Sequence, residues 1–388
     1  MIRELLPFIA ITPATIYSLL TFWCGRQFFS DPGQGAQVQP TSAPRPQIPA
    51  VSILKPVKGM DAGSYDNFAS FCRQNYPGAV QIVFAAASAD DAVIPVIRQL
   101  QADFPGHDIT LVVNPAIHGP NYKVSNLINA FPSVRHDIII VCDSDIRVSP
   151  DYLRSVTAHF EEPDVGLVTS PYRTSDVDGI AAAVEATGFT TEMIPNVLVA
   201  LQLEGLSFAL GASMAVRRRA LEDIGGFPAL VEYLADDYQL GNKVHRAGWR
   251  IVLDTCFVES SIRAERLTTV LTRQLRWART MRVSRPGGYL ASGITLPFPG
   301  LLLAVLAAPT FFTALAAVML LYGTRMTVAT IYSTRFVRDR ILPRWLWLLP
   351  VRDLLSFCSW ALSFLGTTVE WRGSRFSLKP GGTIEEIV

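Results

Sequence analysis

The sequence has too little net charge for a nucleic-acid-binding protein. Its 34 lysines and arginines nearly balance 33 aspartates and glutamates, which leaves a formal charge of +1. Binding to a phosphate backbone needs a basic excess, so we expect no nucleic-acid partner. Charged residues of either sign make up only 17% of the chain. Such a composition is too apolar for an ordinary soluble protein of this length and indicates a membrane portion.

Cysteine pairs are also lacking. The five cysteines are odd in number, and none falls in a CxxC motif: Cys24, Cys72, Cys142, Cys256 and Cys358. No zinc site or disulfide framework is therefore predicted. We interpret the cysteines as small buried residues and expect the soluble part to lie in a reducing compartment. Internal repeats and a GxGxxG motif are absent as well.

Long apolar runs are present near both ends of the chain. Residues 5–23 are nearly all apolar and approach the ~20 residues that a membrane-spanning helix needs. Because no clear cleavage site follows, residues 1–26 are predicted to be an uncleaved anchor rather than a signal peptide. Arg26 at its end places the following segment in the cytoplasm by the positive-inside rule.

The second apolar region lies within residues 289–388 and predicts about three more spans. Residues 289–332 contain one charged side chain, Arg325, and fit a hairpin that turns at Pro309. Four arginines follow and mark a second cytoplasmic loop: Arg335, Arg338, Arg340 and Arg344. The two charge markers agree, so residues 27–288 are expected on the cytoplasmic side of one membrane, for which we expect a bacterial inner membrane.

The last apolar stretch, residues 345–366, is predicted to be a fourth span. It contains Arg352 and Asp353, and a charge at membrane depth is costly and is usually paired or near the interface. Arg352 is expected to face the helix bundle, near bound substrate, or to lie at the interface. The alternative is that it snorkels to the membrane surface.

Between these regions the composition changes at residue 51. Residues 27–50 are predicted to be a linker, because residues 31–50 hold five prolines and almost no apolar side chains. From residue 51 to 288, short apolar strands that alternate with helices predict a cytoplasmic α/β domain with a mostly parallel sheet. The expected strands are residues 51–56, 80–87, 109–113, 138–141 and 166–170, and the expected helices are residues 65–74 and 92–103.

Polar sequences follow the expected strands, where ligands of a parallel sheet bind. Asp90-Asp91 follows one strand and Asp143-Ser144-Asp145 follows another. Between them, the loop of residues 118–123 ends at Lys123, a candidate phosphate contact for which a simple surface lysine is the alternative. We expect all three to line one crevice.

Asp143 and Asp145 are candidate ligands for Mg²⁺ or Mn²⁺. Such hard cations prefer oxygen ligands and can bridge the phosphates of a nucleoside diphosphate leaving group. One or two carboxylates suffice, because the phosphates supply the other ligands. A DxD tripeptide also occurs in turns and helix caps, so its position after a buried strand is what favours the metal site.

Asp237 is the candidate general base. A lipid hydroxyl is a poor nucleophile, and a carboxylate within hydrogen-bond reach can take its proton. Asp236 beside it would raise the proton affinity of the pair through like-charge repulsion. The alternative is that both acids only favour the start of a helix.

Arg273-Gln274-Leu275-Arg276-Trp277 places two arginines on one helix face. Arg276 suits a phosphate, and Trp277 suits an acceptor or the membrane interface. For the later arginines, anionic headgroups are the alternative partner: Arg279, Arg282 and Arg285. Residues 180–214 are apolar but contain three glutamates, so they are predicted to form helices on the membrane surface. Glu192 among them is more readily interpreted as part of a solvated face than as a site residue.

These motifs, in this order, resemble the ceramide glucosyltransferase family, glycosyltransferase family 21, within the GT-A enzymes related to family 2. The resemblance runs from residue 51 to the C-terminus and rests on the combination of motifs. The matching stretches are VSILKPVKG (51–59), NYP (75–77), DD (90–91), KVSNL (123–127), CDSDIRVSPDYL (142–153), VGLVTSPY (165–172), ADDYQLG (235–241), GWR (248–250), RQLRW (273–277) and GGTIEEI (381–387).

The resemblance implies a GT-A domain and a UDP-sugar donor. By this likeness Asp91 would contact uracil, Asp143 and Asp145 would bind metal and diphosphate, and Asp237 would be the base. The box of Arg273, Arg276 and Trp277, together with Asp236, would bind diphosphate and acceptor. The expected reaction transfers glucose or N-acetylglucosamine, with inversion, to a lipid hydroxyl.

The acceptor stays open between two lipids. Animal members of the family carry a histidine in the stretch that corresponds to residues 190–195, where this chain has none. Residues 202–205 and 276–280 look like a bacterial branch that glycosylates hopanoids, so both ceramide and a hopanoid remain expected acceptors. Two alternatives are a processive polysaccharide synthase and a non-catalytic membrane protein, transporter or scaffold, that only binds nucleotide. The oligomeric state is not predicted.

Overall fold

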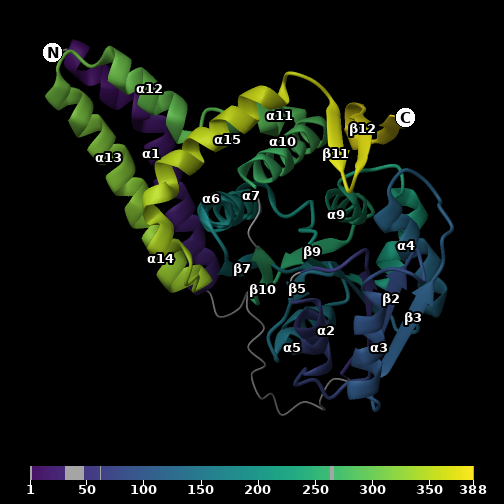
Figure 1. The fold of residues 1–388 in the computed structure, drawn as a ribbon. Coiled ribbons are helices and arrows are strands. Elements are labelled where there is room, and N and C mark those ends of the chain that lie inside the picture. The colour runs from purple at the N-terminus through teal and green to yellow at the C-terminus, as the bar shows by residue number, and fades with distance from the viewer. Residues whose placement is uncertain (1, 31–47, 62, 263–265, 388) are drawn as a thin grey trace. The chain divides into compact units, whose positions relative to one another are not determined.

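The computed structural model describes residues 2–30, 48–61, 63–262 and 266–387. The chain forms two compact units (Figure 1). The sheet unit comprises Asp31–Arg173 and Gly205–Ser261, and the helical unit comprises Met1–Ser30, Thr174–Glu204 and Ile262–Val388. Most of the predicted linker lies outside the described residues. Of the segment predicted as interfacial helices, residues 180–204 belong to the helical unit and residues 205–214 to the sheet unit. The Arg-Trp helix belongs to the helical unit.

A seven-stranded, mostly parallel sheet forms the centre of the sheet unit, which confirms the predicted α/β fold class. Its order is β3 (Asp108–Val113), β2 (Val80–Ala86), β1 (Val51–Pro56), β4 (Ile138–Cys142), β8 (Ser213–Arg217), β6 (Val165–Thr169) and β9 (Arg250–Leu253). In the parallel part, Ile53 of β1 lies opposite Ile82 of β2 and Ile140 of β4. Strand β8, which the sequence did not predict, runs antiparallel to both β4 and β6.

Helices cover this sheet and bury its central strands, among them β1, β4 and β6, on both faces. They are α2 (Ser64–Cys72), α3 (Ile94–Asp103), α4 (Tyr122–Ala130), α5 (Tyr152–Ala158), α8 (Arg218–Asp223) and α9 (Asp236–Arg246), with short helices η1 (Phe131–Ser133), η2 (His159–Glu161) and η4 (Phe227–Leu230). Large side chains fill the core, among them Phe68, Phe84 and Tyr152, each with no exposed surface. Full burial of such a side chain stabilises the fold by roughly 1.5–3 kcal/mol. Strands that are buried on both faces read as continuous apolar runs, and for this reason the sequence revealed them.

The chain reverses its direction across the sheet at β1. From β1 it proceeds to β2 and β3 on one side, and then returns to place β4 on the other side of β1. Ligands of open α/β sheets bind at such a switch point, beyond the carboxyl ends of the two neighbouring strands. The residues just after β1 and β4 are therefore the first place to look for a site. A small second sheet, β5 (Ile146–Arg147), β10 (Val258–Ile262) and β7 (Tyr172–Val177), begins directly after Asp145.

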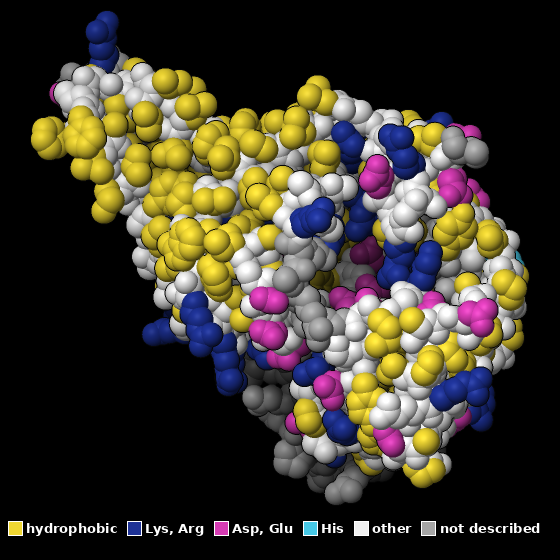
Figure 2. Space-filling model, viewed as in Figure 1, with side chains coloured by type: hydrophobic (Ala, Val, Ile, Leu, Met, Phe, Trp, Pro, Cys, Tyr) yellow, Lys and Arg dark blue, Asp and Glu magenta, His cyan; other side chains and the backbone are white. Residues whose placement is uncertain are grey.

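The helical unit is built around a long first helix. Helix α1 (Ile2–Ser30) packs against α12 (Pro297–Ala307), α13 (Phe311–Ile331) and α7 (Ile194–Glu204). Gly300 allows the close approach of α12, because a Cβ there would lie 2.6 Å from the carbonyl oxygen of Ala10. Many outward side chains on α12 and α13 are apolar, including Leu306 and Phe312 at 74% and 79% exposure (Figure 2). Such a surface suits contact with lipid.

The rest of the helical unit contains shorter elements. They are α6 (Ile180–Gly188), the π-helices η3 (Phe189–Met193) and η5 (Tyr332–Val337), α10 (Leu267–Ser284), α11 (Pro286–Ser292), α14 (Leu342–Trp345), η6 (Leu346–Leu348) and α15 (Leu349–Ser363). A small antiparallel sheet ends the chain, made of β11 (Thr368–Trp371), β12 (Ser374–Leu378) and β13 (Ile384–Ile387), with η7 (Pro380–Gly382) before the last strand. Arg372 and Gly373 form the β11–β12 turn with positive φ angles, as a tight hairpin requires.

Three helical stretches are long and apolar enough to cross a membrane: Arg3–Ser30, Pro286–Ala307 and Phe311–Val337. The first is the predicted anchor, and the other two form the predicted hairpin around Pro309. The predicted fourth span is not among the candidates in the described part of the chain. The longest helix within residues 345–366 is α15, which has 15 residues. At 1.5 Å per residue it would be ~22 Å long, which is short of the ~30 Å hydrocarbon core.

Candidate active site

Asp143 lies directly after β4, at the switch point of the sheet. The backbone N–H of Asp143 donates to the carbonyl of Ala212, at a donor–acceptor distance of 3.2 Å. Lys55 of β1 has no exposed surface, and its Nζ donates to the carbonyl of Asp143 at 2.9 Å. The same Nζ lies 4.1 Å from the centre of the Phe71 ring. A buried lysine from the neighbouring strand therefore fixes the turn that presents the Asp-Ser-Asp carboxylates.

Lys123 connects the two acidic motifs that the sequence singled out. Its Nζ lies 2.9 Å from Oδ1 of Asp143 and 3.2 Å from Oδ2 of Asp236. Burial alone would lower the pKa of Lys123, but the nearby carboxylates of Asp143 and Asp236 raise the pKa above its ordinary value. Lys123 is therefore charged at neutral pH and 17% exposed, and the alternative of a simple surface lysine is wrong.

Asp145 lies among polar groups that sequence reasoning missed. The hydroxyl of Ser260 donates to Oδ2 of Asp145 at 2.9 Å, and the hydroxyl of Ser144 donates to Asp61. Burial, followed by the charge of Asp143, raises the pKa of Asp145 to about 6. Asp61 lies two residues after the matching stretch VSILKPVKG. This position after β1 is the feature of the sequence that could have marked Asp61 as a site residue. Nothing in the sequence pattern indicated Ser260.

The neighbouring carboxylates of Asp143 and Asp145 fit a divalent cation. The pKa of Asp145 is raised partly by Asp143, so a cation shared by the two would relieve this repulsion. Both offer the hard oxygen atoms that Mg²⁺ and Mn²⁺ prefer. In the described residues no group of three or more His, Cys, Asp or Glu side chains is placed to hold a metal.

Asp236 and Asp237 lie in the first turn of α9, where the helix dipole favours acids. Asp236 is buried and Asp237 is half-buried. Oδ1 of Asp237 accepts the backbone N–H of Tyr238 at 2.7 Å. Burial and then the charge of Asp236 raise the pKa of Asp237 to about 6. A half-buried carboxylate with raised proton affinity has the properties of a general base.

Gly211 leaves room for the Asp237 carboxylate. A Cβ at residue 211 would lie 2.6 Å from Oδ2 of Asp237, closer than real Cβ contacts allow. Any other side chain at this position would push the carboxylate away from its present place. Gly211 is thus a further site residue that no sequence motif pointed to.

Asp91 takes part in a separate set of hydrogen bonds. Its two carboxylate oxygens accept the backbone N–H of Gly59 at 2.9 and 3.0 Å, and Oδ1 also accepts the N–H of Val93 at 3.0 Å. Gly59 lies three residues after β1. Asp91 therefore holds the loop that follows this central strand, and its expected contact with uracil stays a prediction.

The predicted Arg-Trp box lies on α10 of the helical unit. Nε of Arg273 donates to Oε1 of Glu185 at 2.8 Å, and Glu185 on α6 is only 2% exposed. Oε1 of Gln274 accepts from Arg352 on α15 at 3.1 Å. The Trp277 ring packs against Phe189 of η3, with ring centres 6.3 Å apart. Neighbouring helices therefore hold the box on several sides.

Comparison with known proteins identifies the family. The model of glycosyl transferase family 21 matches residues 6–384. The chain belongs to glycosyl transferase family 21.

Two relatives are ceramide glucosyltransferases 3 and 1 of Caenorhabditis elegans. Each is 26% identical to this family 21 chain, over 87% and 88% of it and 74% of the relative. Among solved structures, a mannosyltransferase of Pyrobaculum calidifontis in complex with GDP-Man and Mn²⁺ has a TM-score of 0.55 and 18% identity, covering 87% of this chain and 99% of the other. This likeness confirms the GT-A fold.

A network of buried charges connects this box to other helices of the family 21 chain. Glu192 on η3 accepts from Nη2 of Arg352 at 2.8 Å and from the hydroxyl of Ser356 at 2.7 Å. Arg325 on α13 pairs with both oxygens of Asp353, which has no exposed surface. The interpretation of Glu192 as a solvated residue is therefore wrong. Arg352 faces the bundle rather than snorkelling, because an unpaired charge there would be costly.

The arginines that follow the Arg-Trp box bind within the helical unit. Nη2 of Arg282 donates to the carbonyl of Gly366 at 2.8 Å, and Nη2 of Arg279 donates to the carbonyl of Leu365 at 3.4 Å. Arg285 pairs with Glu204. These contacts tie α10 to the segment before β11 and to α7. Anionic headgroups are therefore not needed to account for these arginines.

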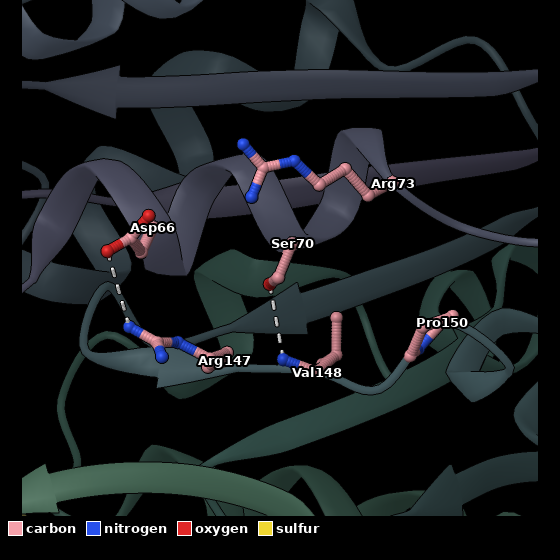
Figure 3. Close-up of a pocket in the computed structure, with 6 residues that line it drawn as sticks. All are labelled: Asp66, Ser70, Arg73, Arg147, Val148 and Pro150. Carbon is pink, nitrogen blue, oxygen red and sulfur yellow. Dashed lines mark hydrogen bonds and ion pairs between the residues drawn. The ribbon is translucent and has the colours of Figure 1, made fainter.

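A pocket lies beside the strand that follows the Asp-Ser-Asp motif (Figure 3). Its volume is about 310 Å³, and its lining residues are Asp66, Ser70, Arg73, Arg147, Val148 and Pro150. Arg147 points toward Asp66, at 3.8 Å, and the N–H of Val148 donates to the hydroxyl of Ser70 at 3.2 Å. None of the predicted site residues lines this pocket, so it is distinct from the acidic cluster.

Proposed function

We propose that this chain transfers a hexose, glucose or N-acetylglucosamine, from a UDP-sugar to the hydroxyl group of a membrane lipid. One observation carries the proposal: Lys123 contacts both Asp143 of the Asp-Ser-Asp motif and Asp236 of the later acidic pair. One lysine side chain thus contacts both the candidate diphosphate site and the residue next to the candidate base, Asp237. Family membership supports the same reaction class.

The residues of the sheet unit supply the proton transfer. Asp237 accepts the proton of the lipid hydroxyl while the oxygen attacks the anomeric carbon from the face opposite to UDP. The bond between that carbon and the diphosphate oxygen breaks, its electron pair leaves with UDP, and the configuration inverts. Lys123 moves from its carboxylate partners toward the departing diphosphate, which attracts the ammonium group as charge develops. Asp91 contacts the uracil ring.

Asp143 and Asp145 would hold the Mg²⁺ or Mn²⁺ ion. When bound, the ion supplies positive charge that stabilises the diphosphate of the leaving group. Arg276 is proposed to contact the diphosphate as well, and Arg273 and Trp277 belong to the diphosphate and acceptor box. Glu185 fixes the Arg273 guanidinium, so this side chain is already oriented before substrate binds.

We further propose that the lipid acceptor is ceramide or a hopanoid, and that the catalytic part faces the cytoplasm. Both lipids have the hydroxyl nucleophile that the reaction needs and an apolar body that lies in the membrane. Three candidate spans support a multi-pass protein, and we propose a bacterial inner membrane as its location.

A panel of substrates tests the function. Membranes that contain the full-length chain would receive UDP-glucose or UDP-N-acetylglucosamine, each with ceramide or a hopanoid, and UDP release and the glycolipid product would be measured. We expect one donor and acceptor pair to give lipid-dependent UDP release. Release that does not rise on addition of either lipid would contradict the proposal and favour a nucleotide-binding protein, and a growing polymer would favour a polysaccharide synthase.

The pH dependence tests the assignment of the base. Asp237 must be deprotonated to accept a proton, so kcat/KM should fall as the pH drops through about 6. Because the pKa of Asp237 is higher in the folded chain than in the unfolded chain, the folded state binds its proton more tightly. The contribution of Asp237 to stability is therefore greatest below the pKa of an unfolded aspartate and is lost as the pH rises through about 6. Acid unfolding through this group therefore does not explain the loss of activity.

The variant Asp236→Asn identifies which carboxylate sets the acidic limb. Loss of the neighbouring charge lowers the pKa of Asp237, so the limb should move to lower pH. Asp145 also has a pKa of about 6, but its neighbours are Asp143 and Asp61 rather than Asp236. A limb that stays in place in Asp236→Asn would assign the titration to Asp145 and contradict the role of Asp237.

A further inference from the structure

The loop that follows α13 carries four arginines within ten residues: Arg335, Arg338, Arg340 and Arg344. We call these residues the arginine loop, and all four side chains are exposed. The acid within the loop, Asp339, is only 6% exposed and forms no ion pair with these arginines in the described part of the chain. In the described part of the chain, the ion pairs of the helical unit involve other arginines. The loop therefore presents concentrated positive charge to its surroundings.

Buried hydrogen bonds give the arginine loop a fixed shape. The backbone N–H of Asp339 donates to the carbonyl of Ser333, and the hydroxyl of Ser333 donates to the carbonyl of Asp339, both at 2.8 Å. The Asp339 carboxylate accepts from the Thr190 hydroxyl at 2.7 Å and from the N–H of Ile341 at 2.6 Å. Arg338, with φ at 53°, makes the turn between them. A ligand would therefore bind a surface that is already ordered, at a lower entropic cost.

The arginine loop lies at one end of the candidate membrane helices. The candidate span Phe311–Val337 ends within it. The hydroxyl of Tyr332 donates to the carbonyl of Thr21 at 2.6 Å, and the rings of Phe29 and Phe336 stack with centres 5.3 Å apart. The end of α1 with its exposed Arg26 is thus at the same end of the bundle. Figure 2 shows Lys and Arg side chains gathered at this end, where α14 lies.

Two tryptophans follow the loop and fit the same position. Trp345 and Trp347 have ring centres 6.1 Å apart, and Trp347 is 59% exposed. Tryptophan rings favour the level of the lipid headgroups, where one side of the ring is apolar and the other is wet. Arginines beside them would reach the phosphate groups of the lipids, which guanidinium groups bind through paired hydrogen bonds.

We propose that the arginine loop binds the headgroups of anionic phospholipids. Positive side chains that form no ion pair among the described residues, a preformed loop and two exposed or partly buried tryptophans all fit a negatively charged lipid surface. Each arginine at such a surface strengthens binding by roughly fivefold, so several together select anionic over zwitterionic lipids. The proposed lipid preference belongs to the membrane helices. It goes beyond the proposed sugar transfer and does not depend on that reaction.

Tryptophan quenching can measure the lipid preference directly. The full-length chain would be reconstituted in phosphatidylcholine vesicles with equal small fractions of brominated phosphatidylglycerol or brominated phosphatidylcholine. We expect severalfold stronger quenching by the anionic lipid. In Arg335→Gln/Arg340→Gln/Arg344→Gln the preference should fall to about one, since the removed charges supply it. Arg338 is kept in this variant because its positive φ shapes the loop.

Matched controls make the result specific. Arg98→Gln/Arg219→Gln/Arg246→Gln removes three exposed arginines of the sheet unit and should keep the preference. Trp345→Phe/Trp347→Phe should lose most of the selective quenching, which places the lipid next to the loop. Equal quenching by both lipids in the wild-type chain, an unchanged preference in the loop variant, or an equal loss in the control would each overturn the proposal. Displacement of the lipid by millimolar inorganic phosphate would also overturn it, because the loop would then be a phosphate site.

Discussion

The variant Asp237→Asn should bind UDP as the wild-type chain does and lose glycosyl transfer by roughly 10²–10⁴-fold. Asparagine has the same shape, and its Oδ1 can still accept the Tyr238 N–H. It cannot take a proton from the lipid hydroxyl, so the loss should appear in kcat. UDP binding by calorimetry and initial rates of glycolipid formation would measure the two effects separately. A variant with near-normal kcat would remove Asp237 from the role of base.

The substitution Gly211→Ala approaches the same carboxylate without changing its chemistry. The added Cβ would lie 2.6 Å from Oδ2 of Asp237 and so displace it. We expect kcat to fall at least tenfold, because small errors in the position of a base are costly. Gly106→Ala is the matched control, since its Cβ would contact nothing within 4 Å. Equal activity in both variants would mean that the present position of the Asp237 carboxylate is not the catalytic one.

The sequence predicted the sheet unit well because its information is local. Strand β4 is a continuous apolar run, β1 and β2 are mostly apolar, and Asp143 comes directly after β4. The rule for parallel sheets then placed the first acidic motif at the ligand-binding edge. Contacts between distant segments could not be predicted in this way. Lys123 contacts Asp236 only because α4 and α9 meet in the folded unit, and no sequence spacing encodes their distance.

The helical unit was predicted less well, for a related reason. Hydropathy counts residues along the chain, so it detected the hairpin of α12 and α13. It also predicts a fourth span at residues 345–366, which stays a prediction. In the structure, Arg352 and Asp353 of this segment form ion pairs with Glu192 and Arg325. Apolar composition does not distinguish a helix that packs against other helices from one that faces lipid. The partners of a charged residue show what it packs against, and charges within a membrane span are usually paired as well.

These partners can be tested by removing the Arg352 guanidinium. Arg352→Gln leaves Glu192 without its closest cation, and breaking a largely buried ion pair costs about 3 kcal/mol. We expect the midpoint of thermal unfolding in detergent to fall by several degrees. Arg375→Gln is the control. Nε of Arg375 lies 3.8 Å from Oε1 of Glu370, both side chains are exposed, and such ion pairs contribute little to stability.

A double-mutant cycle separates the pair from general damage. If Arg352 and Glu192 stabilise each other, Glu192→Gln should lower the free energy of unfolding less in the Arg352→Gln background than in the wild-type chain. In that background the Glu192 carboxylate has already lost the Arg352 charge. Arg352 also donates to Gln274 of the Arg-Trp box. Its loss should therefore raise the KM for the UDP-sugar as well as lower stability, whereas Arg375→Gln should change neither. Two results together would contradict a network of side chains that orients the box. They are additive effects of Arg352→Gln and Glu192→Gln on the free energy of unfolding, and an unchanged KM in Arg352→Gln.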